Sequence, residues 1–350
     1  MADHAFWRKA VAALPRESVN PVVDAGFRIG KGDKVVTAGS CFAQHISRHL
    51  VRHGFNFLVT ESAHPLVSDR AEQYGYGVYS ARYGNIYSSR QLLQLFERAF
   101  GTFVPHEDVW EKDRRFLDAF RPAIQPGGFA SVEELQADRL QHFAAVRRAF
   151  AEMDYFIFTL GLTECWRSRA DGAVYPLCPG VLGGDFDDAN HEFLNLDVGS
   201  VLADMEGFIQ GVRAINPAVK VVLTVSPVPL VATATGAHVL SATTLGKSIL
   251  RVAADMLCSR LPDVFYFPAY EIVTGPQARG LYFADDLRSV TERGVERVMS
   301  VFLDSCTHGF DGSMPAAGVD EDREGRRFIA EMTDVVETVC EEEILDSGIR

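Results

Sequence analysis

The segment from Val35 to His45, VVTAGSCFAQH, places two candidate nucleophiles side by side. Ser40 and Cys41 follow an apolar run that ends at Gly39. A hydroxyl or thiol becomes a strong nucleophile when a neighbouring base takes its proton or its surroundings favour the anion. The N–H groups at a helix start can also stabilise an oxyanion. Taken alone, the segment favours a plain turn, with Ser40 as a helix cap.

The elements around this segment alternate between strand and helix. Short, nearly unbroken apolar runs predict strands at 34–38, 155–160, 219–225 and 264–268, and helical spacing predicts helices at 88–100, 131–150, 200–215 and 244–261. Unbroken apolar strands are typical of a parallel sheet covered on both faces, and the alternation indicates a doubly wound α/β fold. Ligands of such sheets bind beyond the carboxyl ends of the strands, where Ser40 is expected.

The rest of the chain divides around this core. We expect an N-terminal extension over 1–30, a single α/β domain over 31–305 and an acidic helix over 319–347. Two segments rich in Gly, Pro, Tyr and Asp, near 54–87 and 167–198, interrupt the pattern. Long irregular segments inside a domain are often binding loops, so both are predicted to be insertions next to a ligand.

Composition narrows the class of partner. The chain has a formal charge of −13 and a pI near 5.2, which argues against nucleic acid because such binding depends on Lys and Arg. No run approaches the ~20 apolar residues that span a bilayer, and the six cysteines are scattered, as in a reducing compartment. We expect a cytoplasmic protein with a small-molecule or glycan substrate, no nucleic-acid or membrane partner, and an undetermined oligomeric state.

Several motifs together resemble one family. GSCFAQHI resembles the signature of the GSCFA family, whose members are placed with the SGNH (GDSL-like) hydrolases. Four further segments resemble the family in the right order, so that the resemblance covers about 30–305: GNIYSSRQLLQLF at 84–96, TLGLTECW at 159–166, NPAVKVVLTVSPVPL at 216–230 and YFADDLRSVTERGVERV at 282–298. It implies a flavodoxin-like, three-layer α/β/α fold with a parallel sheet.

The resemblance also implies roles for individual residues. Ser40 matches the nucleophilic serine, and Cys41 stands where the family of hydrolases has an apolar residue. Gly84 matches the glycine whose backbone N–H binds the oxyanion, with the Asn85 amide beside it. In the GxND block, Thr163 replaces the asparagine that donates to the oxyanion, and a threonine hydroxyl can donate one hydrogen bond there.

The last block, DxxH, is incomplete in this chain. Asp286 matches its aspartate, but Ser289 occupies the position of the histidine that acts as base. Because a catalytic triad is defined by geometry and not by chain order, another histidine can serve. We prefer His238, just after the 219–225 strand, with Asp286 orienting it. His45 is the second choice, and a third alternative makes Glu164 or Asp286 the base.

Other side chains are candidates for substrate binding. Trp166 could stack on a sugar ring or an acyl chain, and Glu164 lies two residues before it. Arg288 and Lys247 could hold an anionic group of the substrate.

A metal site and a cofactor are not expected. His45, His49 and His53 share one helical face, but no carboxylate accompanies them and two arginines add positive charge nearby.

Three functions remain open from the sequence. The first is a hydrolase or acyltransferase that uses Ser40 on an O-acyl ester, acetyl in our prediction, of a carbohydrate-type substrate. The second is a degraded module that binds a glycan or a protein without catalysis, because the DxxH histidine is missing. The third is a thiol enzyme in which Cys41 pairs with His45, one helical turn away, since a helix N-terminus lowers a thiol pKa.

Overall fold

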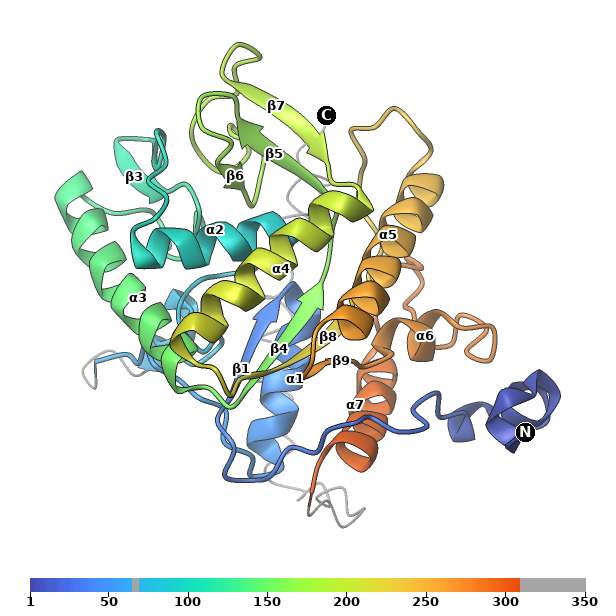
Figure 1. Ribbon diagram of the computed structural model, residues 1–350. Coiled ribbons are helices and arrows are strands. Elements are labelled where there is room, and N and C mark those ends of the chain that lie inside the picture. The colour runs from blue at the N-terminus through green and yellow to red at the C-terminus, as the bar shows by residue number, and fades with distance from the viewer. Residues whose placement is uncertain (65–68, 309–350) are drawn as a thin grey trace.

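The core of the protein is a parallel sheet with the strand order β1-β4-β8-β9 (Figure 1). The computed structural model describes residues 1–64 and 69–308, apart from the side chain of Cys41. The strands are β1 (Val35–Gly39), β4 (Tyr155–Leu160), β8 (Lys220–Val225) and β9 (Val264–Tyr266). Gly39 pairs with Thr159, which pairs with Thr224, so the carboxyl ends of three strands lie level. The four predicted strands are confirmed.

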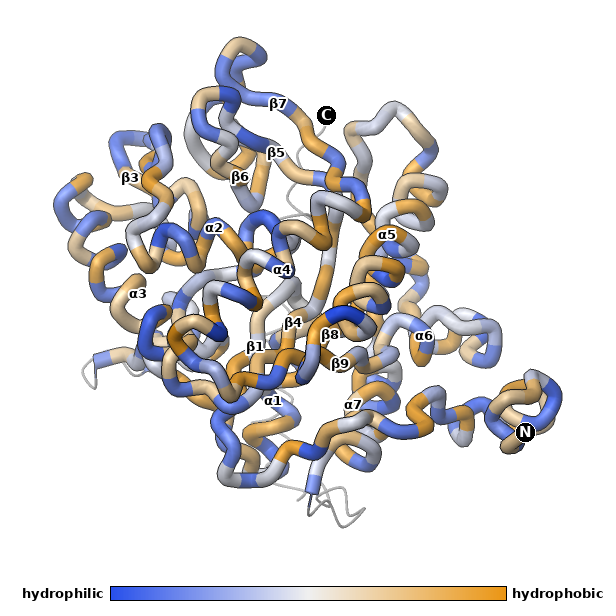
Figure 2. The backbone as a smooth tube through the Cα atoms, in the orientation of Figure 1, coloured by the Kyte–Doolittle hydropathy of each residue, from blue (hydrophilic) through white to orange (hydrophobic). Residues whose placement is uncertain are grey.

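Helices cover both faces of this sheet. One face carries α2 (Ser89–Phe100), α3 (Val132–Glu152), α4 (Val198–Ile215) and α5 (Val239–Arg260), and the other carries α1 (Cys41–Arg52), α6 (Ala269–Thr274) and α7 (Glu292–Cys306). Side chains alternate between the two cores, as when Phe156 and Phe158 pack with the first set of helices and Ile157 with the second. Figure 2 shows hydrophobic residues recurring along these strands and helices, with hydrophilic stretches in the outer loops. The result is the expected three-layer α/β/α fold.

Two small antiparallel sheets were not predicted. Strands β5 (Glu164–Ser168), β6 (Val174–Tyr175) and β7 (His191–Asn195) form one, and β2 (Val109–Lys112) with β3 (Arg115–Asp118) form the other. Their strands are short and mix polar with apolar residues, so they lack the continuous apolar runs of the central sheet. In Figure 1 the sheet of β5, β6 and β7 lies above the carboxyl ends of the central strands.

The N-terminal residues form short helical turns, Asp3–Ala5, Arg8–Ala12 and Arg16–Ser18, which Figure 1 shows away from the central sheet. The chain then returns to the body, where Ile29 bridges Thr307 after α7. The predicted acidic helix over 319–347 lies outside the described residues. No helix among the described residues has the length and apolar character needed to cross a membrane.

Candidate functional site

Ser40 stands at the carboxyl end of β1, as the residue that precedes α1. Gly39 makes this turn possible, because its φ is +142° and a Cβ there would lie 2.7 Å from both the Cβ and the carbonyl oxygen of Thr159. The Ser40 side chain is buried, with 9% of its surface exposed, and its hydroxyl has no hydrogen-bond partner in the described part of the chain.

This hydroxyl does not act as a helix cap. Ser40 occupies the N-cap position of α1 but makes no side-chain capping hydrogen bond. The corresponding residues of four other helices each accept one from a backbone N–H three residues on, namely Ser88, Ser131, Asp197 and Thr291. Buried polar groups are nearly always hydrogen-bonded, and N-cap serines typically stabilise the helix. The plain-turn interpretation of Ser40 therefore leaves its hydroxyl unexplained.

Two further hydroxyls at this edge of the sheet share that property. Thr159 on β4 and Thr224 on β8 are fully buried, and the Oγ1 atom of each has no hydrogen-bond partner among the described residues. In the register of the sheet, Thr159 lies opposite both Gly39 of β1 and Thr224 of β8. The sheet end next to Ser40 thus contains a row of buried hydroxyls, which bound water or a substrate oxygen can satisfy.

The loop that contains Gly84 and Asn85 crosses two of these strand ends. The N–H of Ile86 donates to the carbonyl of Gly39 at 2.9 Å, and the carbonyl of Tyr87 accepts from the N–H groups of Gly161 and Leu162 at 3.2 and 2.8 Å. Gly84 has a φ of +71°, the left-handed region that favours glycine. The structure therefore brings this predicted oxyanion loop to the strand ends beside Ser40.

The Asn85 side chain holds the loop to α1. Its Oδ1 atom accepts hydrogen bonds from Gln44 Nε2 at 3.2 Å and from the Tyr79 hydroxyl at 3.3 Å. Its Nδ2 group donates to the Tyr87 hydroxyl at 3.2 Å, and all four side chains are buried. Sequence reasoning missed Gln44 and Tyr79, although Gln44 falls within the GSCFAQH motif.

The segment after β4 meets the same site from the neighbouring strand. A Cβ on Gly161 would lie 3.0 Å from the Tyr87 carbonyl oxygen and 3.6 Å from the Ser40 Cβ, so this glycine faces the serine directly. Thr163 is buried, and its hydroxyl lies against Gly246 of α5. The next residue of that helix, Lys247, is also buried and donates from Nζ to the Gly161 carbonyl at 2.9 Å.

The predicted base and its orienting carboxylate lie elsewhere. His238 is exposed and caps α5, where its Nδ1 accepts from the N–H of Leu240 at 3.2 Å. Asp286 is exposed and closes its own turn, accepting from the N–H groups of Arg288 and Ser289 at 2.9 Å each and from the Ser289 hydroxyl at 2.5 Å. Partial burial raises its pKa, but these hydrogen bonds outweigh that effect and lower it. No contact joins these two side chains to each other or to Ser40 in the described residues.

The predicted binding residues lie on β5 and at the Asp286 turn. Glu164 accepts from the Thr233 hydroxyl at 2.7 Å and from the Ala234 N–H at 3.2 Å, which fastens the loop before α5 to β5. Trp166 packs edge-on against Phe186 and Phe193, with ring centroids 5.2 and 5.6 Å apart. Arg288 is half-buried next to the Asp286 turn. The structure therefore does not gather these three side chains in one cluster with Ser40.

The histidines of α1 lie along one helix, next to arginine side chains. The rings of His49 and His53 stack with centroids 6.2 Å apart. Burial, followed by the charge of Arg48, lowers the pKa of His45 to about 3, and burial lowers that of His49 to about 4. Among the described residues, no group of three or more His, Cys, Asp or Glu side chains could hold a metal ion. The Cys41 side chain lies outside the described part, so the thiol alternative stays a prediction.

The comparison with protein families agrees with the motifs at this site. The model of the GSCFA family matches residues 34–302. The chain belongs to the GSCFA family. This match includes Ser40, the Gly84–Asn85 loop, the segment after β4 and the Asp286 turn. Among curated proteins, no sequence matches the chain.

Two solved structures show distant similarity to this GSCFA protein. One, from Streptococcus pneumonia and described as a platelet activating factor, has 15% identity and a TM-score of 0.27, covering 49% of this chain and 65% of its own. The other is an acetyl esterase mutant with an acetate ion, at 12% identity and a TM-score of 0.26, covering 76% of this chain and 92% of its own.

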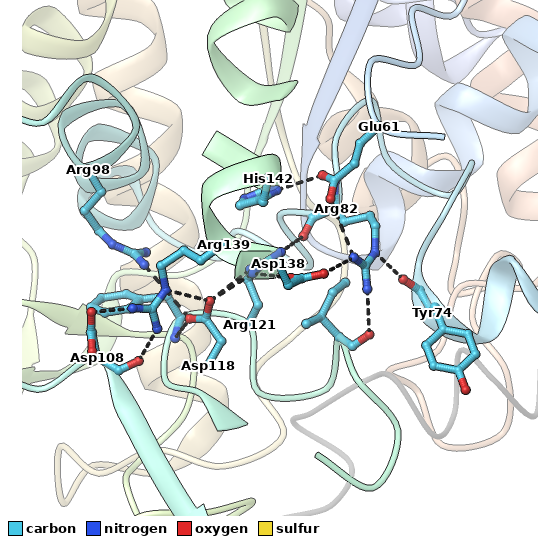
Figure 3. A network of polar contacts seen from close by, with 12 residues as sticks. Glu61, Tyr74, Arg82, Arg98, Asp108, Asp118, Arg121, Asp138, Arg139 and His142 are labelled. Atoms are coloured by element: carbon cyan, nitrogen blue, oxygen red, sulfur yellow. Dashed lines mark hydrogen bonds and ion pairs between the residues drawn. The ribbon is translucent and has the colours of Figure 1, made fainter. Parts of the chain in front are cut away.

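A network of buried ion pairs lies next to the predicted oxyanion loop and joins it to α3 (Figure 3). Arg82, two residues before Gly84, bonds to Asp138 of α3 at 2.7 Å and to the carbonyl of Tyr74 at 2.6 Å. Its N–H donates to Glu61 at 2.7 Å, and Glu61 accepts a further bond from His142 Nδ1 at 2.8 Å. The irregular 54–87 segment is therefore tied to α3 through charged groups.

The charges of this network balance. It pairs four guanidinium groups with four carboxylates, so that 4 − 4 = 0: Arg82, Arg98, Arg121 and Arg139 with Glu61, Asp108, Asp118 and Asp138. Burial raises the pKa of Glu61, but the hydrogen bond from His142 and the neighbouring charges bring it down to about 2. Burial lowers the pKa of His142 to about 4, which keeps its ring neutral and leaves the balance intact.

Proposed function

We propose that this GSCFA protein is a serine esterase or O-acyltransferase that acts on an acetyl ester of a carbohydrate-type substrate. The observation that carries the proposal is the buried Ser40 hydroxyl, which has no partner among the described residues and does not cap α1 although it occupies the N-cap position. Membership of the GSCFA family and the resemblance of its motifs to SGNH hydrolases support the reaction class. The carbohydrate substrate is carried over from that resemblance.

In this proposal Ser40 Oγ attacks the ester carbonyl and the acyl group passes to the serine. The backbone N–H groups of Ser40 and Gly84, with the Thr163 hydroxyl, stabilise the oxyanion that forms. Such preorganised donors commonly contribute 10²–10³-fold each. The acyl group then passes to water or to a second hydroxyl. Trp166 and Glu164, on the sheet above the strand ends, would contact the part of the substrate that leaves.

Labelling with a fluorophosphonate probe and hydrolysis of p-nitrophenyl acetate test the proposal. We expect stoichiometric labelling of the wild-type protein, and loss of labelling and hydrolysis in Ser40→Ala. Ser47→Ala is the matched control, because it removes another buried hydroxyl of α1 whose bond goes to the Gln44 carbonyl. Loss in Cys41→Ala with full activity in Ser40→Ala would transfer the role to the thiol.

A second function is favoured by the Asp286 turn. Ser289 occupies the position of the DxxH histidine and donates to Asp286, so this turn contains no histidine–aspartate unit. A module that binds an acetylated glycan without cleaving it would have this arrangement. An unlabelled Ser40 in a protein that still binds such a glycan by calorimetry would establish this function in place of the enzyme.

A further inference from the structure

Lys247 is an unusually placed lysine. Its side chain is 3% exposed, whereas every other lysine of the chain is exposed or half-buried. Lysine is almost never fully buried unless its amine is paired, because removing the charge from water is costly. Its Nζ lies 2.9 Å from the carbonyl oxygen of Gly161, the residue whose α-carbon faces the Ser40 side chain. Lys247 and Ser40 therefore both lie next to Gly161.

The other candidate bases are less suited to this position. His238 lies nine residues before Lys247 on α5, about 13 Å along the helix axis, and is exposed. His45 packs edge-on against Phe42 on α1, and its pKa is lowered to about 3. The Glu164 carboxylate accepts hydrogen bonds from the loop before α5, and the Asp286 carboxylate accepts them from its own turn. Lys247, by contrast, presents its amine to the backbone of Gly161, which lies next to Ser40.

We propose that Lys247 is a catalytic residue, the proton acceptor for Ser40, in place of the histidine that the DxxH turn lacks. This inference rests on the proposed function. A buried lysine suits the task because burial favours the neutral amine, and Ser–Lys pairs are a recognised alternative to Ser–His–Asp. The Gly161 carbonyl accepts one N–H of Lys247 and so holds the amine at the end of β4.

The proton is conserved through the reaction. As Ser40 Oγ forms its bond to the acyl carbon, its proton passes to the neutral Nζ, giving an ammonium. When the bond between the acyl carbon and the leaving oxygen breaks, the ammonium returns the proton to that oxygen. In the second half, the attacking water or hydroxyl gives its proton to Nζ, and Ser40 Oγ receives it as the acyl–serine bond breaks.

The rate of fluorophosphonate labelling of Ser40 tests this role, with Lys247→Met and Lys247→Arg as the variants. Loss of a general base commonly slows a reaction by about 10²–10⁴-fold, and we expect such a loss in both variants. Arginine keeps the donor to Gly161 but cannot give up its proton, so it cannot act as a base. Labelling of Lys247→Arg at the wild-type rate would overturn the proposal and leave the lysine a structural donor.

Chemical rescue separates catalysis from folding. In Lys247→Ala, added methylamine should restore part of the labelling rate with a saturating dependence on its concentration; no rescue in a folded variant overturns the role. Lys220→Met is the matched control, because Lys220 is a half-buried lysine at the opposite end of β8. His238→Ala should label at the wild-type rate, and a slower rate in this variant would make His238 the base in place of Lys247. Absence of labelling in the wild-type protein would instead contradict the proposed function itself.

Discussion

Removing one carboxylate from the ion network next to the predicted oxyanion loop should lower the free energy of unfolding more than removing a charge at the surface. Asp118 is 1% exposed and receives bonds from Arg121 at 3.0 Å and Arg139 at 3.2 Å, with Arg98 at 3.9 Å. Asp118→Asn keeps the shape but leaves four guanidinium groups with three carboxylates. Breaking a buried ion pair by removing one partner costs about 3–5 kcal/mol, a large part of the ~5–15 kcal/mol that stabilises a typical domain.

Urea unfolding measures this cost as a shift of the midpoint at constant slope. The exposed pair Arg251–Asp255 gives the control, and Asp255→Asn should cost less than about 1 kcal/mol. The double variant Asp118→Asn with Arg98→Met restores the balance at three against three, so its loss should be smaller than the sum of the single losses. A loss below about 1 kcal/mol in Asp118→Asn, or strict additivity in the double variant, would refute the charge-balance argument.

Three further predictions follow from the same structure. The pKa of His142 is about 4 in the folded chain and 6.5 in the unfolded chain. The stability that His142 contributes above pH 6.5 should therefore fall as the pH drops towards 4, by up to about 1.4 kcal/mol per pH unit. His142→Gln should reduce this pH dependence, measured as urea midpoints at pH 7, 6 and 5. Gly161→Ala should slow labelling of Ser40 about tenfold, because its Cβ would lie 3.0 Å from the Tyr87 carbonyl oxygen and 3.6 Å from the Ser40 Cβ, and an unchanged rate would contradict this geometry. Gly39→Ala should lower the melting temperature more than Gly84→Ala, because a Cβ at Gly39 meets the next strand at 2.7 Å whereas a Cβ at Gly84 meets nothing within 4 Å; equal losses would count against the close approach.

The central sheet was predictable because each strand is buried on both faces. Runs such as YFIFTL at 155–160 are almost wholly apolar, and burial of every residue of β4 explains why. The strands β5 to β7 follow no such pattern, since they are half-buried and depend on cross-strand partners such as Trp166 with Phe193. Their positions were therefore set by tertiary contacts that the local sequence does not record.

The positions of the candidate site residues were predictable where these residues stand at strand ends. Ser40 and the Gly84 loop follow from the motifs and from the position of ligands in parallel sheets. Lys247 does not, because the periodic pattern of α5 gives no sign that this position faces the end of β4. The helix also begins at Val239, five residues before the predicted start, which turns His238 from a loop residue into a helix cap.

The position of β1 has a consequence for the timing of activity during synthesis. This strand lies at the edge of the sheet, and its partner β4 follows 155 − 35 = 120 residues later in register. The ion network adds residues up to His142, and Lys247 comes after β8. Ser40 thus leaves the ribosome early. The groups that surround it in the folded chain are synthesised over the following 200 or so residues, and Lys247 comes 247 − 40 = 207 residues later. An emerging chain carries an ordinary serine, and the buried hydroxyl of Ser40 gains its surroundings only with the closed domain.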